Sequence, residues 1–224
     1  MEAVANRRPG RPARLSRDAV LRAAAHIADE RGLDALTMQR VGEQVGAEAM
    51  SLYRHVRNKE DLLDGIVDLV YAEMELPRPG SDWHKAMRDR AISARDVLRR
   101  HPWAISLMES RSSPGPANLR HHDAVSGVLL AAGFSSVETT HAYNLLDSYI
   151  YGFVLQETTL PFGTPEEMEA MAGSMIQASS PDEYPHLRTV ATELLAAGFD
   201  YADEFEFGLD LILEGLERRH TGAR

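Results

Sequence analysis

Apolar residues recur at intervals of three and four along the chain, which is the spacing of one face of an α-helix. The first such segment places its apolar side chains at Val20, Leu21, Ala24, Ile27 and Ala28. No segment alternates apolar and polar residues with the period of two that a half-buried strand requires. The pattern therefore predicts an all-α fold.

Capping residues set the ends of the first four predicted helices. Ser16, Thr37 and Asn58 each precede a helical pattern, as N-caps do. Gly32 and Gly46 are expected to end the first two helices. The second helix is thus predicted at Thr37–Val45, the third from about Glu48 to His55, and the fourth from Asn58 to a point before Pro77. Further helices are expected at residues 82–100, 102–111, 115–132, 135–160, 165–179, 184–197 and 200–219.

Charge is divided unevenly along the 224 residues. The formal net charge is −10, yet residues 1–60 hold 11 Lys and Arg against 8 Asp and Glu. The remainder is strongly acidic. A basic end on an acidic body is typical of a protein that meets nucleic acid at one end only, because the body repels the phosphates.

The composition restricts the cellular compartment in which the protein is expected. The absence of cysteine excludes disulfides and thiolate metal sites and fits a reducing compartment. The polar N-terminal stretch has no apolar core of a secretory signal. The longest weakly polar run, residues 124–134, is shorter than the roughly 18 residues that a membrane span needs. We expect a cytoplasmic protein with no membrane partner.

The second and third predicted helices, joined by a turn at Gly46-Ala47, have the layout of a helix-turn-helix. The second helix of such a pair lies in the major groove of DNA. Leu52 and Val56 are spaced to face inward, which leaves polar groups for phosphates and base edges. These groups are Ser51, Tyr53, Arg54 and His55, with Lys59 on a backbone phosphate.

The motifs in this region carry a family resemblance. They are A-x-x-I-A-x-x-x-G-L-x-A-L-T-M from Ala24, V-G-x-x-V-G from Val41 and S-L-Y-R-H-V-x-N-K-x-x-L-L from Ser51. The segment resembles the DNA-binding domain of TetR-family transcriptional regulators. The C-terminal motifs G-F-V-L-Q-E (from Gly152) and F-E-F-G-L-D-L-I-L-E-G-L (from Phe205) are similar to the tetracycline-repressor subgroup.

The resemblance implies a helical homodimer with N-terminal DNA-binding heads and a C-terminal body for ligand binding and dimerisation. We divide the chain accordingly into a flexible basic arm (1–15), a helix-turn-helix domain (16–60) and the body (61–224). The resemblance adds three DNA contacts to those above: Gln39, Ala49 and Met50. Tetracycline repressors have tryptophan where this chain has Arg54; because arginine favours guanine, a different operator is expected.

The arm R-R-P-G-R-P contains Arg7, Arg8 and Arg11. Arginines beside a Gly-Pro turn suit a narrow A·T-rich minor groove. A solvated basic tail is the alternative, and the residues do not decide between the two.

In the body, helix 200–219 places an apolar stripe along one side, and helix 135–160 is apolar nearly all round. Together they could form a four-helix dimer interface with a second copy. The alternative is an ordinary core within one chain, and the resemblance favours the dimer. The stripe consists of Phe205, Gly208, Leu209, Ile212, Gly215 and Leu216.

The resemblance also implies a small-molecule cavity in the body. Pockets combine aromatic rings with a few polar groups. Met108 and Arg111 stand where tetracycline repressors place the histidine and threonine that hold a magnesium-chelated drug. This departure argues against such a chelate and leaves the ligand open. Candidate lining residues are Trp103, Leu107, Met108, Tyr143, Asp147 and Tyr151.

Two other classes of function compete. The Glu-x-x-His pairs Glu138–His141 and Glu183–His186 follow the ligand pattern of di-iron carboxylate enzymes, although Pro185 interrupts the second pair. The run His121-His122-Asp123 is interpreted as a solvated face, since neighbours on a helix point apart. A helical adaptor that binds only protein would leave the basic front end unexplained. We find no nucleophile motif and no phosphate-cradling loop, so we expect no catalytic residue, metal or cofactor.

These observations predict a ligand-responsive transcriptional repressor. Its dimer would present two recognition helices to a near-palindromic operator, roughly 34–36 Å apart. A small molecule in the body would shift the fourth helix and spread the heads.

Overall fold

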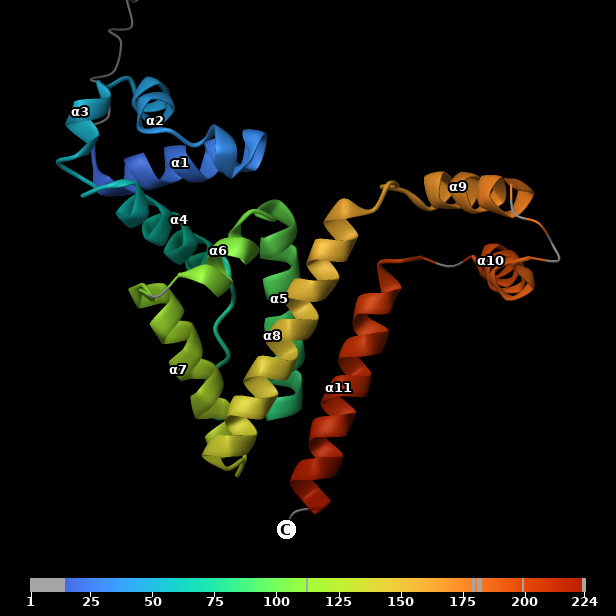
Figure 1. Cartoon of the computed structure of the whole chain (residues 1–224). Coiled ribbons are helices and arrows are strands. Elements are labelled where there is room, and N and C mark those ends of the chain that lie inside the picture. Colours follow the sequence, from blue (N-terminus) through green and yellow to red (C-terminus); the bar gives the residue numbers. More distant parts are fainter. Residues whose placement is uncertain (1–14, 112, 179, 181–182, 199, 223–224) are drawn as a thin grey trace, which may run out of the picture.

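The computed structural model describes residues 15–111, 113–178, 180, 183–198 and 200–222, and within these ranges every regular element is a helix (Figure 1). The all-α prediction is confirmed. The elements are α1 (Arg17–Arg31), the 3₁₀ turn η1 (Leu33–Ala35), α2 (Met38–Val45), α3 (Ala49–Leu52), α4 (Lys59–Glu73), α5 (Trp83–Arg100), α6 (Ala104–Ser110), α7 (Pro116–Ala131), α8 (Ser136–Thr159), α9 (Pro165–Ala178), α10 (Pro185–Ala197) and α11 (Asp203–Gly222).

The three predicted N-caps are confirmed. The side-chain oxygen of Ser16 accepts a hydrogen bond from the amide of Ala19 at 3.2 Å. Thr37 caps α2, and Asn58 caps α4 through the amide of Asp61 at 2.8 Å. Each bond satisfies an amide that the first helical turn leaves unpaired, so these boundaries follow from local chemistry.

The third helix is shorter than predicted. It ends at Leu52, and residues 53–55 form a turn in place of the expected helical extension to His55. The amide of His55 donates to the carbonyl of Leu52 at 2.8 Å, a tightened three-residue bond. The carbonyl of His55 accepts from Arg17 of α1 at 2.9 Å, so a long-range contact terminates the helix.

The head and the body are joined through α4. In the head, α1 packs against α2 and α4 (Figure 1). In the body, α4 contacts α5, α6 and α7, while α8 and α11 lie against α5. Helices α9 and α10 pack on each other at the far ends of α8 and α11. The predicted division at residue 60 falls in the first turn of α4, and it stays a prediction.

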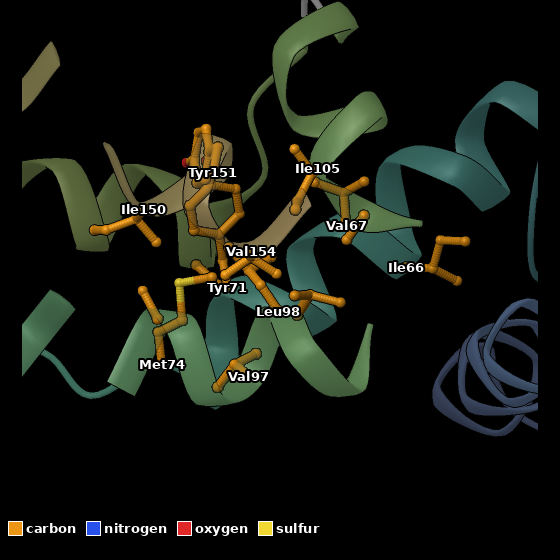
Figure 2. Close-up of a cluster of buried hydrophobic side chains, with 14 of the residues drawn as sticks. Ile66, Val67, Tyr71, Met74, Val97, Leu98, Ile105, Ile150, Tyr151 and Val154 are labelled. Atoms are coloured by element: carbon orange, nitrogen blue, oxygen red, sulfur yellow. The ribbon is translucent and has the colours of Figure 1, made fainter. Parts of the chain in front are cut away.

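One hydrophobic core runs from the head into the body. Figure 2 shows Val67 and Tyr71 of α4 among side chains of the body helices, whereas Ile66 of the same helix lies apart from them. Val97 and Leu98 come from α5, and all of these residues are buried. Helix α4 therefore contributes side chains to both ends of this core.

Candidate DNA-binding surface and effector site

The turn between α2 and α3 depends on two glycines. Gly46 adopts a left-handed conformation, with φ of +67°, which costs other residues more than glycine. Gly42 lies where α2 approaches the chain entering α3. A Cβ on Gly42 would come within 2.7 Å of the carbonyl oxygen of Ala47 and 3.2 Å of the amide of Ala49. The sequence therefore permits the close helix approach of a helix-turn-helix.

The residues around α3 divide into an inner and an outer set. Leu52 and Val56 are buried in the core, as their spacing predicts. Met50 is 75% exposed although it is apolar, and Tyr53 and Arg54 are also exposed. Ala49, Ser51 and His55 are half-buried. Met50 and Tyr53 are exposed beside the cationic side chain of Arg54, and together they form a surface suited to contact another molecule.

Two further predicted DNA contacts lie on neighbouring elements. Gln39, in the first turn of α2, is exposed and donates to Glu43 at 3.0 Å. Lys59 is exposed at the first position of α4. Arg7, Arg8 and Arg11 lie outside the described residues. The DNA contacts themselves stay predictions.

Asp61 ties the outer surface to the rest of the head. Its carboxylate pairs with Arg17 of α1 at 2.8 Å and accepts the amide of Arg57 at 2.7 Å. Because the hydrogen bond from Arg17 favours the ionised form, the pKa of Asp61 is lowered to about 2. Arg17 thus holds the start of α4 against the turn that follows α3.

A buried polar stripe runs along α8. Thr139, Tyr143, Asp147 and Tyr151 follow one another at intervals of four, so they share one face, and all four are buried. The Tyr151 hydroxyl donates to Asp147 at 3.3 Å. Burial raises the pKa of both Tyr143 and Tyr151, so their hydroxyls stay protonated. Three of the predicted ligand-binding residues are therefore brought together.

Two residues that the sequence did not indicate complete this cluster. Arg90 of α5 forms a buried ion pair with Asp147, and its Nε donates to Nε2 of His121 of α7 at 3.5 Å. His121 is fully buried, which corrects the interpretation of this residue as part of a solvated face, whereas His122 and Asp123 are exposed as expected. Burial lowers the pKa of His121 to about 3, so the ring is neutral. The neighbouring His122 stacks on Tyr143 and bonds its hydroxyl at 3.0 Å.

The other three predicted ligand-binding residues belong to the α6 region. The indole N–H of Trp103 donates to Asp29 of α1 at 2.6 Å, which gives it a role between body and head. Leu107 and Met108 are half-buried against the core. Arg111, just after α6, pairs with Asp64 and Glu60 of α4 at 2.5 Å each.

Residues of the predicted dimer stripe divide between two faces of α11. Phe205 and Leu209 are fully buried by their own chain, so for them the alternative of an intrachain core is correct. Gly208 accommodates Tyr149 of α8, whose hydroxyl would lie 2.2 Å from an added Cβ. Ile212 and Leu216 are partly buried against the core, and the space beside Gly215 is open. Sequence periodicity could not tell which partner covers the stripe.

The geometry disfavours the di-iron alternative. Glu138 serves the capping box of α8, where its carboxylate accepts the amide of Ser135. Glu183 precedes α10, so the second pair does not share a helix turn. Across the described ranges, no group of three or more His, Asp or Glu side chains could hold a metal ion.

In these same ranges, no helix has the length and apolarity to cross a bilayer.

Family models account for nearly all of the chain. Residues 20–66 match the bacterial regulatory proteins of the tetR family, and residues 76–220 match the tetracyclin repressor-like C-terminal domain. The chain belongs to the TetR family. Its head is therefore a DNA-binding helix-turn-helix domain, and the family resemblance seen in the sequence is confirmed.

TetR-family relatives align along most of their length. The chain is 32% identical to the HTH-type transcriptional repressor DrrR1 of Streptomyces coeruleorubidus, covering 94% of this chain and 81% of the relative. It is 31% identical to the tetracycline repressor protein class A from transposon 1721 of Escherichia coli, covering 94% of each. ActR of Streptomyces coelicolor, solved with (S)-DNPA, shares 25% identity at a TM-score of 0.73 over 92% of this chain and 98% of ActR. The chain is a ligand-responsive, DNA-binding transcriptional repressor of this TetR family.

Proposed function

We propose that this protein represses transcription as a homodimer bound to a near-palindromic operator, and that an organic effector in the body releases it. The observation that carries the proposal is the pairing of an exposed surface around α3 with a buried polar cluster in the body, linked by α4 and α6. We further propose that it acts in the cytoplasm and needs no catalytic residue or cofactor.

The operator would be read by the exposed set around α3. Arg54 can contact a guanine in the major groove, and Met50 can cover a thymine methyl group. Lys59 would hold a backbone phosphate, which fixes the register of the head on DNA. The departure from tryptophan at Arg54 favours an operator that differs from that of the tetracycline repressors.

The dimer interface would form on the open faces of α8 and α11. Phe207 is 63% exposed on α11, and Leu211, one turn later, is also exposed. On α8, Val137, Leu145 and Leu155 are also exposed. Exposed apolar patches of this kind mark protein interfaces. Gly152 and Gly215 have open space beside them, which would allow a second helix to approach closely.

Effector binding would reach the head through the α6 region. Arg111 pairs with Glu60 and Asp64, so a shift of α6 pulls on the first turns of α4. Trp103 and His101 both contact Asp29 of α1, at 2.6 and 2.7 Å. A coupling of about 1–3 kcal/mol through these bonds would change operator affinity roughly 5–150-fold. The complex of the related ActR with (S)-DNPA favours an organic effector.

A gel-shift titration with the DNA upstream of the chain's own gene tests the proposal. We expect retardation at low salt that weakens steeply as salt rises, because the contacts to phosphates release counterions. The double variant Tyr53→Ala/Lys59→Ala should no longer retard the DNA, whereas its circular dichroism should remain that of the folded helical protein. Absence of retardation by the unsubstituted protein would favour the adaptor alternative.

A further inference from the structure

His101, which follows α5, has a carboxylate at each of its two ring nitrogens. Nδ1 lies 2.7 Å from the carboxylate of Asp29 in α1, and Nε2 lies 3.4 Å from that of Glu73, the last residue of α4. The His101 side chain is only 12% exposed, so solvent covers little of the ring. These three side chains form a head–body joint, which connects a helix of the head with α4 and with a helix of the body.

The protonation state of the ring decides whether both contacts can form. A neutral imidazole has one N–H donor and one nitrogen with a lone pair, whereas an imidazolium donates from both nitrogens. With a neutral ring, one of the two carboxylates would face a lone pair and be repelled. Both contacts of the head–body joint are therefore favourable only when the ring of His101 is charged.

Glu73 has other cationic partners besides His101. Its carboxylate pairs with Arg100 at 2.6 Å, and the charge of Arg22 on α1 also acts on it. Burial opposes the ionisation of Glu73, but the bond from Arg100 and the charge of His101 lower its pKa. Glu73 therefore stays ionised and keeps a partner when His101 loses its proton.

Asp29 depends on His101 more strongly. Its carboxylate also accepts the indole N–H of Trp103 at 2.6 Å, but that group carries no charge. Within the described part of the chain, its only ion pair is the one with His101. Loss of the proton from the ring removes a Coulomb attraction at a partly covered site, where such an attraction is stronger than in water. The contact between head and body is then weakened.

We propose that the head–body joint is a pH-sensitive device: the charged ring of His101 holds α1 against the body, and its deprotonation loosens the head and lowers operator affinity. Histidine is the side chain that ordinarily changes its charge between about pH 5 and about pH 8. Because the closed joint requires the proton, a rise in pH favours the open one. A loosened head has more freedom to lose on binding DNA, which weakens binding. This inference rests on the proposed function, since it concerns the regulation of operator binding.

The operator affinity of the whole chain at about pH 6 and about pH 8.5 tests the inference, measured by fluorescence anisotropy at constant ionic strength. The parent is compared with His101→Gln, whose side chain stays neutral. Other titrating groups of the DNA-binding surface, such as His55, are common to both proteins and cancel in the comparison. We expect the parent to lose roughly fivefold more affinity than the variant as the pH rises, a change at the lower end of usual allosteric couplings.

Two further variants test the pairing. Asp29→Asn removes the carboxylate but keeps an oxygen that can accept from Trp103, and it should abolish the extra pH dependence as His101→Gln does. His26→Gln is the matched control: His26 is exposed and pairs with Glu30 of its own helix at 3.4 Å, so the parent's pH dependence should remain. An equal pH dependence in the parent and in His101→Gln would overturn the inference, as would its loss in His26→Gln.

The outcomes are separable from those of the proposed function. Retardation of the operator at a single pH tests that function, whereas operator binding with the same pH dependence in the parent and His101→Gln overturns only the role of the head–body joint. If no operator is retarded, urea unfolding of the same proteins at the two pH values decides. The excess of the parent's urea midpoint over that of His101→Gln should shrink as the pH rises, and an equal excess at both pH values would overturn the inference. If His101→Gln fails to fold, Asp29→Asn takes its place in both measurements.

Discussion

Trp103 donates its indole N–H to the carboxylate of Asp29 at 2.6 Å, and this bond joins the start of α6 to α1 of the head. His101 contacts the same carboxylate at 2.7 Å. One acidic side chain near the end of α1 therefore receives two groups from the body.

A double-mutant cycle measures this bond. Trp103→Phe keeps an aromatic ring but removes the donor, and Asp29→Ala removes the acceptor. We expect a coupling of about 1 kcal/mol in the free energy of unfolding, measured with urea, because each change alone already breaks the bond. Strictly additive effects of the two substitutions would contradict a bond between head and body.

Asp61 should make stability depend on pH. Its folded pKa of about 2 lies below the unfolded value of about 3.9, so its contribution is complete above pH 4 and is lost as the pH falls toward 2. Since Arg17 is partly exposed, we expect about 1–2 kcal/mol at neutral pH. Asp61→Asn should be less stable than the parent at pH 7 and approach it near pH 2. Asp18→Asn, which alters an exposed pair with Arg22, should show little of this dependence.

Gly42→Ala should weaken the head through packing alone. The added methyl group would meet the backbone of Ala47 and Ala49, which cannot move away as a flexible side chain can. We expect a loss of about 1–3 kcal/mol in thermal unfolding and weaker operator binding. Gly127→Ala on α7 is the control, because nothing lies within 4 Å of its added Cβ. It should be neutral or slightly stabilising, since alanine is the better helix former.

Arg54→Ala should relax sequence preference at one base position in each half-site by about 1–3 kcal/mol. The change would be measured as relative affinities for a set of single-base operator variants. Lys85→Ala, in the acidic body, should leave the whole preference unchanged. If Arg54→Ala retains the parent's full preference, Arg54 reads no base.

Charge placed on the open face of α11 should separate the dimer. We expect Phe207→Arg combined with Leu211→Arg to give a monomer in light scattering, because the partner would have to bury two unpaired cations. Operator affinity should fall as well, since two linked heads bind more tightly than one. Leu76→Arg, on an exposed loop residue, should remain dimeric. A dimer that survives the double substitution would place the interface elsewhere.

The features that sequence predicted best were those fixed by nearby residues. Ser16, Thr37 and Asn58 cap their helices by bonding amides three residues away, so their roles are visible in a short window. The end of α3 was predicted less well because it depends on Arg17, 38 residues from His55. A local pattern carries no information about such a contact.

The body illustrates the same limit. Tyr143, Asp147 and Tyr151 could be found because they recur along one helix face. Arg90 could not, since nothing near it in the chain indicates that Asp147, 57 residues later, is its partner. Phe205 and Leu209 were correctly placed on an apolar stripe, but periodicity does not identify the surface that covers it.

The buried pair of Arg90 and Asp147 has a consequence for how such a protein could change over generations. Loss of either member would strand the other charge in the interior, at a cost of several kcal/mol. Substitutions that change the effector specificity would therefore arise first at the surrounding aromatic residues. Arg90 and Asp147 would be retained, or both would be replaced together.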